Sequence, residues 1–181
     1  MGANKAFLDF SGQTLLARAL SALSAVCKTV TIVGDPAIFS SFGRVVADVF
    51  PGCGPLGGIH AALTNSSAEL NLMLAVDLPF VSAELLNFLL RTAETADALV
   101  TVPRTSKGFQ PLCAVYRRDF VGVAEQALRA QNYKIDATFA TVSVRVVEEP
   151  ELSAAGFSEK NFFNINTPED HRTAEGFNCR A

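Results

Sequence analysis

The sequence predicts an α/β fold of the Rossmann-like type, in which a mostly parallel sheet is covered by helices on both faces. Short apolar runs typical of strands alternate along the chain with segments whose apolar residues recur every three or four positions, as in helices. The length of 181 residues suits one domain, residues 1–181. A hydrophobic fraction of 49% supplies enough apolar side chains for the core of such a domain.

The predicted elements follow one another in alternating order. Strands are expected at residues 29–33, 44–49, 69–76, 98–102, 112–116 and 142–147, with a short extended piece at 162–165. Helices are expected at residues 14–27, 35–42, 59–63, 82–95 and 118–130, and from residue 168 onward. The runs TVTIV (29–33) and ELNLMLAV (69–76) are apolar enough for strands buried on both faces. Ser11-Gly12 predicts a turn with capping chemistry before the first helix, and PGCGPLGG (51–58) predicts a loop.

The composition argues against several classes of protein. The net charge is −3, whereas a nucleic-acid-binding surface usually brings a basic excess, so no nucleic-acid partner is expected. No run of 18 apolar residues occurs, so no membrane span is expected. The four cysteines form no C-x-x-C pair, and a disulfide framework is not expected, which favours a cytoplasmic protein.

In sheets of this kind a ligand binds beyond the carboxyl ends of the strands, so polar residues at those ends are the first candidates for a site. Asp77 follows an apolar strand, and Pro79 turns the chain away directly afterwards. Mg²⁺ is usually held by one or two carboxylates together with substrate phosphates, which makes Asp77 a candidate metal ligand. A carboxylate at this place can equally cap the next helix or hold a turn, and that interpretation stays open.

The glycine-rich loop at 51–58 is a second candidate, because glycine lets the backbone approach a ligand closely. The amides that open the following helix can face an anion or the edge of a base. The alternative is that the segment is only a tight connection between a strand and a helix. Lys5 is a third candidate, as a cation for phosphates, and is otherwise a surface lysine.

Asn164 and Asn166 alternate with apolar residues, so both side chains are expected on one side of an extended segment. The polar stretch PRTSKGFQ, which contains Arg104, Lys107 and Gln110, is either a substrate-facing loop or a solvated hairpin. His60 and His171 have no partner motif, and no nucleophile–histidine arrangement can be argued. Together these residues favour a phosphate-containing ligand bound with Mg²⁺, while hydride transfer and plain binding stay open.

Five motifs occur in order along the chain. They are MG-x-x-K-A at the start, D-x-F-P-G-x-G-P-L-x-G-I at 48–59, D-x-P-F at 77–80, Q-P-L-C-A-V-Y at 110–116 and N-x-N-T-P-E-D at 164–170. With these motifs the chain resembles the molybdenum cofactor guanylyltransferase (MobA) family over nearly its whole length, from residue 1 to 171. The resemblance implies a nucleotidyltransferase fold.

The resemblance implies transfer of GMP from GTP to the terminal phosphate of molybdopterin, with release of pyrophosphate. It implies catalytic roles for Asp77 and Lys5, and Mg²⁺ held by Asp77 and Asn166. The residues implied to bind the nucleotide or to complete the phosphate side are Lys5, Asp48, Gly54, Pro55, Leu56, Asp77, Asn164 and Asn166. Gln110 and Arg104 are implied to touch the pterin, and transient contact with molybdopterin-handling proteins or molybdoenzymes is conceivable.

The sequence departs from the family pattern at its start. The family begins with a strand and an L-A-G-G-x-S-x-R-M-G loop, of which only Met1-Gly2 has a counterpart, so the first strand is expected to be missing. Guanine is favoured over cytosine by the G-P-L-x-G segment and by Asn164 and Asn166, where cytidylyltransferases tend to carry acids. The alternatives are an enzyme that uses CTP or another phosphorylated acceptor, and a shortened, inactive domain that binds pterin or nucleotide.

Overall fold

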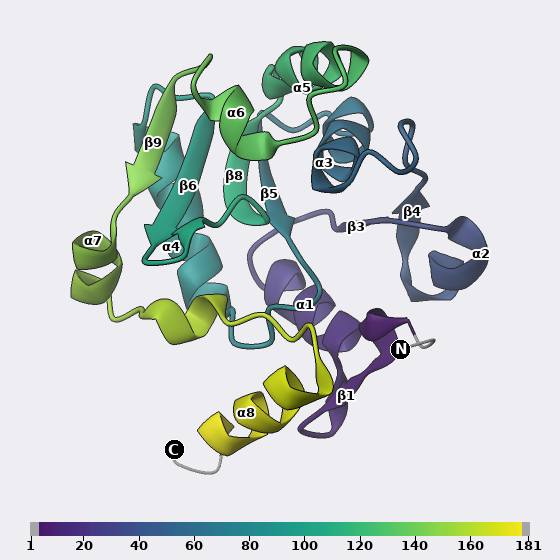
Figure 1. The fold of residues 1–181 in the computed structure, drawn as a ribbon, viewed down its shortest axis with the longest axis vertical. Coiled ribbons are helices and arrows are strands. Elements are labelled where there is room, and N and C mark those ends of the chain that lie inside the picture. Colours follow the sequence, from purple (N-terminus) through teal and green to yellow (C-terminus); the bar gives the residue numbers. More distant parts are fainter. Residues whose placement is uncertain (1–3, 179–181) are drawn as a thin grey trace.

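The computed structural model describes residues 4–178, and a five-stranded sheet forms its centre (Figure 1). The strands are β5 (Leu70–Leu74), β8 (Cys113–Arg117), β6 (Val100–Thr105), β7 (Gly108–Phe109) and β9 (Val144–Val147). β8 lies between β5 and β6, and β6 also pairs with β7 and β9. β9 runs parallel to β6, whereas β8 runs antiparallel to both of its neighbours.

The sheet is therefore mixed, and the prediction of a mostly parallel sheet is wrong for β8. The segment between β6 and β8 holds only the short strand β7, which turns back on β6. A parallel connection needs a crossover of about a dozen residues or more, usually a helix, and this segment is too short for one. β8 must therefore return antiparallel. β5, β6 and β9 keep a common direction, as strand–helix alternation predicts.

Helices cover both faces of this sheet, as expected for the α/β class. The side chains of β8 alternate between the faces: Ala114 and Tyr116 lie in one core, and Cys113 and Val115 in the other. The first core is completed by α3 (Pro55–Thr64), α5 (Phe120–Arg129) and α6 (Ile135–Phe139). The second is completed by α1 (Leu15–Ser24), α4 (Ala83–Thr95) and α7 (Glu149–Ala154).

A second, smaller sheet consists of β3 (Thr31–Val33) and β4 (Arg44–Val46), which run parallel. Between them lie α2 (Pro36–Phe39) and the 3₁₀ helix η2 (Ser40–Phe42). Within residues 4–178, β3 pairs only with β4, and β5 pairs only with β8. Each of these strands keeps a free edge, and all residues of β3 and β5 are partly exposed. The prediction that both strands are buried on both faces is wrong for that reason.

Segments near both ends of the described chain lie together below the main sheet, where the first part of α8 (Pro168–Asn178) lies beside the hairpin of β1 (Asp9–Phe10) and β2 (Gln13–Thr14) (Figure 1). A small core joins them through Phe10, Leu15, Ile165 and Ala174. The His171 Nε2 atom lies 2.7 Å from the carbonyl oxygen of Asp9. In the chain, the 3₁₀ helix η1 (Lys5–Phe7) directly precedes β1, and the 3₁₀ helix η3 (Glu159–Phe162) precedes the segment that leads into α8.

Most predicted helices and strands are present, with ends shifted by a few residues. Ser82 caps α4 as predicted, and Thr14 rather than Ser11-Gly12 caps α1, by accepting from the Ala17 N–H at 3.2 Å. α3 begins at Pro55 instead of Ile59, because Gly54, at a φ of +68°, turns the chain into a helix with Pro55 in its first turn. The sequence did not predict α6, α7 or the β1–β2 hairpin. Across residues 4–178, no helix is long and apolar enough to span a bilayer.

Candidate active site

Asp77 lies three residues beyond the end of β5, at the edge where ligands bind in folds of this kind. Its backbone oxygen accepts a 2.9 Å hydrogen bond from the Ile165 N–H, which ties the end of β5 to the segment carrying the two asparagines. Its side-chain Oδ1 atom is buried and has no hydrogen-bond partner. A buried carboxylate oxygen without a partner is costly, so this geometry leaves Asp77 ready to accept a cation or a donor.

Lys5 and Asn166, which are 161 positions apart in the sequence, are in direct contact. The Lys5 Nζ donates to the Asn166 Oδ1 at 2.8 Å. Lys5 is also close enough to Asp77 to lower the pKa of that carboxyl group, although burial is the larger effect and raises it overall. The structure thus brings Lys5, Asp77 and Asn166 into one electrostatic environment.

Asp170 fixes the turn that presents Asn166. Its Oδ2 accepts from the N–H groups of Asn166 and Thr167 at 3.0 and 2.8 Å, while the Asp170 N–H donates to the Thr167 Oγ1 at 3.1 Å. Hydrogen bonds from the Thr167 side chain and from these N–H groups lower the pKa of Asp170. This reciprocal arrangement resembles a capping box at the start of α8, and Thr167-x-x-Asp170 is its signal in the sequence. Asp170 was not among the predicted site residues.

A cavity of about 660 Å³ opens at this end of the sheet. Asp77, Asn164, Asn166 and Asp170 contribute its polar groups on one side. Lys107 and Gln110 contribute polar groups from the β6–β7 hairpin and the segment after it, and the remaining walls include Phe109, Leu112 and Phe163. The volume and the mixture of aromatic walls with a few polar groups are typical of small-molecule sites.

The segment from Asp48 to Leu56 lies elsewhere, from the loop after β4 into the first turn of α3, and lines no part of this cavity. The Asp48 Oδ1 accepts from the Phe50 N–H at 2.8 Å. A Cβ atom on Gly57 would lie 2.8 Å from the Asp48 Oδ2, so the carboxylate packs directly against the glycine. The Leu56 side chain is fully buried in the core, which leaves only its backbone for a ligand.

The stretch PRTSKGFQ forms the hairpin of β6 and β7, and its cations differ in their contacts. Arg104 does not line the cavity: its Nε and Nη2 donate to both carboxylate oxygens of Glu148, at 3.0 and 2.5 Å. Lys107 does line it. The Gln110 Nε2 donates to the Thr105 Oγ1 at 3.1 Å, which leaves the Gln110 carbonyl oxygen for a ligand.

Of the residues implied by the resemblance, the structure brings together Lys5, Asp77, Asn164 and Asn166. Asp48, Gly54, Pro55 and Leu56 form a second group, in the loop after β4 and at the start of α3, which does not line the cavity. Met1-Gly2, the first part of the first motif, lies outside the described residues. His60 is buried against the Phe50 ring, with centroids 5.0 Å apart, and lies behind the second group as a packing residue.

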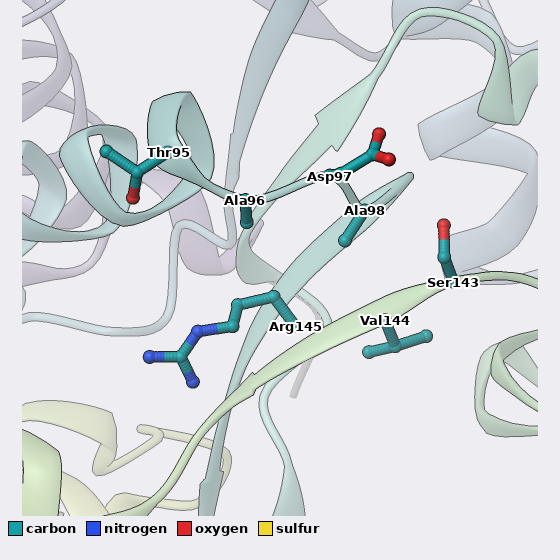
Figure 2. A pocket seen from close by; sticks show the side chains of 7 residues that line it. All are labelled: Thr95, Ala96, Asp97, Ala98, Ser143, Val144 and Arg145. Carbon is teal, nitrogen blue, oxygen red and sulfur yellow. The ribbon is translucent and has the colours of Figure 1, made fainter.

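A second pocket, of about 370 Å³, lies where the end of α4 meets β9 (Figure 2). The guanidinium of Arg145 and the carboxylate of Asp97 point in different directions there. Arg145 already pairs with Glu151 at 2.6 Å. Since its polar groups do not converge, this pocket is not a candidate active site.

The fold and the cavity at Asp77 together define a class of protein. Asp77 and Asn166 line a cavity at the carboxyl edge of an α/β sheet, Lys5 bonds to Asn166, and among the described residues no histidine lines the cavity beside a nucleophile. Such a site suits the transfer of a phosphoryl-type group between bound molecules, in which the protein mainly positions its substrates and neutralises charge.

Comparison with known proteins identifies the family. A model described as "MobA-like NTP transferase domain" matches residues 1–145, and the chain belongs to that family of nucleotidyltransferases. A probable molybdenum cofactor guanylyltransferase from Clostridium perfringens is 34% identical over 171 residues, covering 93% of this chain and 85% of the relative. One from Pelotomaculum thermopropionicum is 37% identical over 175 residues, covering 94% and 83%. These matches confirm the family that the five motifs indicated.

A solved structure supports the fold. Molybdopterin-guanine dinucleotide biosynthesis protein A from Archaeoglobus fulgidus matches with a TM-score of 0.86 at 26% identity, covering 99% of this chain and 93% of that one. The α/β nucleotidyltransferase fold is thereby confirmed, with the mixed sheet described above.

Proposed function

We propose that this chain transfers GMP from GTP to the terminal phosphate of molybdopterin, forming the guanine dinucleotide cofactor and pyrophosphate. The relatives named as guanylyltransferases support this reaction. The observation that supports it most directly is the buried Oδ1 of Asp77, which has no hydrogen-bond partner. Asp77 and Asn166 line a cavity large enough for an acceptor, and Lys5 donates to Asn166.

The residues present fit a Mg²⁺ ion. Within residues 4–178 no group of three or more His, Cys, Asp or Glu side chains could hold a metal. Mg²⁺ does not need such a group, because it is commonly held by one or two carboxylates, waters and substrate phosphates. Asp77 would hold it through the Oδ1 that lacks a partner, and Asn166 through the second lone pair of Oδ1. When bound, the ion supplies charge neutralisation on the nucleotide phosphates.

In this proposal the acceptor phosphate attacks the α-phosphorus of GTP, the bond to the β-phosphate oxygen breaks, and pyrophosphate leaves. The protein supplies position and charge and forms no covalent intermediate. The Lys5 ammonium has three donors, so it can keep its bond to Asn166 while donating to a phosphate oxygen. Asp170 holds the backbone of Asn166 and Thr167 in place while this happens.

The nucleotide would extend from this site toward the segment that opens α3. The helix starts directly after Gly54 with Pro55, which has no N–H, and the Gly57 N–H donates to the Gly54 oxygen at 3.1 Å, so the Leu56 N–H is the group in this turn proposed to meet an anion or a base edge. Asp48 is held by the Phe50 N–H and by packing on Gly57, which suits a role in recognising the ribose or the base. Guanine is proposed over cytosine because this segment keeps G-P-L-x-G and because Asn164 and Asn166 are amides.

The test is product formation by the purified chain with Mg²⁺, molybdopterin, and either GTP or CTP, followed by pyrophosphate release and mass spectrometry of the pterin product. We expect the guanine dinucleotide, with kcat/KM for GTP exceeding that for CTP by about tenfold or more. Equal use of CTP would contradict the base assignment. Consumption of GTP with a sugar phosphate but not with molybdopterin would contradict the acceptor.

A further inference from the structure

The charges around the cavity are unevenly distributed. Among its lining residues within the described chain, Lys107 is the only cation, whereas Asp77 and Asp170 are both acids. Even with Mg²⁺ held by Asp77, an anionic acceptor that enters the cavity must approach the Asp170 carboxylate and the triphosphate of the nucleotide. Repulsion between like charges opposes this approach, so a cation on the acceptor side has a direct electrostatic benefit.

The backbone that carries Lys107 is firmly held. The Ser106 N–H donates to Glu149 at 2.6 Å, and the Ser106 Oγ donates to the Glu159 Oε1 at 2.9 Å. The Lys107 N–H donates to the Thr105 Oγ1 at 3.2 Å. The turn of the β6–β7 hairpin is thus tied to α7 and η3, and it fixes where the Lys107 side chain begins.

The Lys107 side chain itself remains available to a ligand. It is 64% exposed, and its Nζ lies 3.8 Å from the Glu159 Oε1, beyond hydrogen-bond length. The same Nζ lies 5.8 Å from the centre of the Phe163 ring, which borders the cavity. An exposed ion pair of this kind contributes little stability, so a ligand with two or three anionic oxygens can replace it.

We propose that Lys107 binds the phosphate of the acceptor, as a specificity-determining residue that selects phosphorylated acceptors over their unphosphorylated forms. This inference rests on the proposed function for the identity of the acceptor. Lys5 then faces the nucleotide phosphates from the side of Asn166, and Lys107 faces the acceptor phosphate from the hairpin, so that each reacting anion has its own cation.

The first experiment measures binding directly. A stable fluorescent pterin phosphate, and the same pterin without its phosphate, are titrated into wild type, Lys107→Met and Lys160→Met. Lys160 is the matched control, because it also lies over aromatic rings, 5.2 Å from Phe80 and 5.4 Å from Phe177, and does not line the cavity. We expect Lys107→Met alone to weaken binding of the pterin phosphate, by about tenfold, and to leave the unphosphorylated pterin unchanged.

A second variant should act in the opposite direction. Glu159→Gln keeps an oxygen for the Ser106 hydroxyl but removes the charge that competes for Lys107. Binding of the pterin phosphate should tighten by about two- to fivefold. In guanylyl transfer, Lys107→Met should raise the KM for molybdopterin by about tenfold and change the KM for GTP by less than about twofold.

The proposal is overturned if Lys107→Met binds the pterin phosphate as tightly as wild type, or if wild type does not bind it. Equal weakening by Lys160→Met would also overturn it, because the loss of any nearby positive charge would then explain the weaker binding. Binding that depends on Lys107 without any guanylyl transfer would count against the proposed reaction and would support the anion site.

Discussion

The main sheet and the β3–β4 region differ sharply in how they are packed. In the main sheet, β8 contributes buried side chains to the cores on both faces, and β6 contributes Val100 and Val102 to one of them. From residue 31 to 54, which spans β3, α2, η2, β4 and the loop before α3, no residue is buried. The polar groups that converge on the cavity are therefore positioned by the main sheet, which is the well-packed region. The Asp48 segment relies on local hydrogen bonds and on its connection to α3, which makes it the more adaptable half of the site.

The largest expected contrast is in stability. Phe120 is fully buried and packs on Tyr116 with ring centroids 5.0 Å apart, so Phe120→Ala should lower the free energy of unfolding by about 3–5 kcal/mol. Phe42 is 47% exposed and touches mainly Phe7, so Phe42→Ala should cost about 1 kcal/mol or less. Urea denaturation measures both. Similar losses would show that the β3–β4 region is as tightly packed as the main sheet.

Two adjacent glycines of α3 offer a finer contrast. In Gly57→Ala the new Cβ would lie 2.8 Å from the Asp48 Oδ2 and 3.1 Å from the Phe50 oxygen, so the Asp48 segment must shift. We expect a loss of about 1–2 kcal/mol in stability, together with weaker GTP binding in calorimetry. In Gly58→Ala the nearest atom is Val33 Cγ1 at 3.9 Å, and helix propensity should raise stability by up to about 1 kcal/mol. If Gly57→Ala were tolerated as well as Gly58→Ala, the packing of Asp48 would have no role in the site.

The smallest expected effect concerns the turn that presents Asn166. Asp170→Ala removes the acceptor for the N–H groups of Asn166 and Thr167, and should lower kcat/KM for guanylyl transfer by about tenfold through misplacement of Asn166. Glu169→Ala, in the same first turn of α8, removes the same charge from an exposed position. The two variants should therefore differ, and equal losses would mean that only charge matters at this end of the cavity.

Much of the fold can be predicted from periodicity, because the long helices and the apolar strands bury one face or both. The short helices α6 and α7, of five and six residues, contain too few turns to show that periodicity. The sequence predicts too late a start for α3 because Pro55 and Gly57-Gly58 favour a loop, while the burial of Leu56 favours the helix.

The site was less predictable than the fold. The sequence marks Asp77 and Asn166 as strand-end polar residues, but the contact of Lys5 with Asn166 depends on the core of Phe10, Leu15, Ile165 and Ala174 that joins the two ends of the chain. The resemblance implied that Arg104 touches the pterin, whereas Lys107 lines the cavity and Arg104 does not. The difference depends on the acids around the hairpin, of which Glu148, directly before α7, binds Arg104.

The most direct test of the account is guanylyl transfer by Asp77→Asn at saturating Mg²⁺ and GTP, with Asp97→Asn as the control. Asp77→Asn keeps the shape of the side chain and removes the charge on a buried oxygen that has no partner, so the folded protein should be at least as stable as wild type. We predict that kcat falls by about 100-fold or more for Asp77→Asn and by less than about twofold for Asp97→Asn, which borders the other pocket (Figure 2). Transfer by Asp77→Asn within about threefold of wild type would contradict the assignment of Asp77 as the centre of the site.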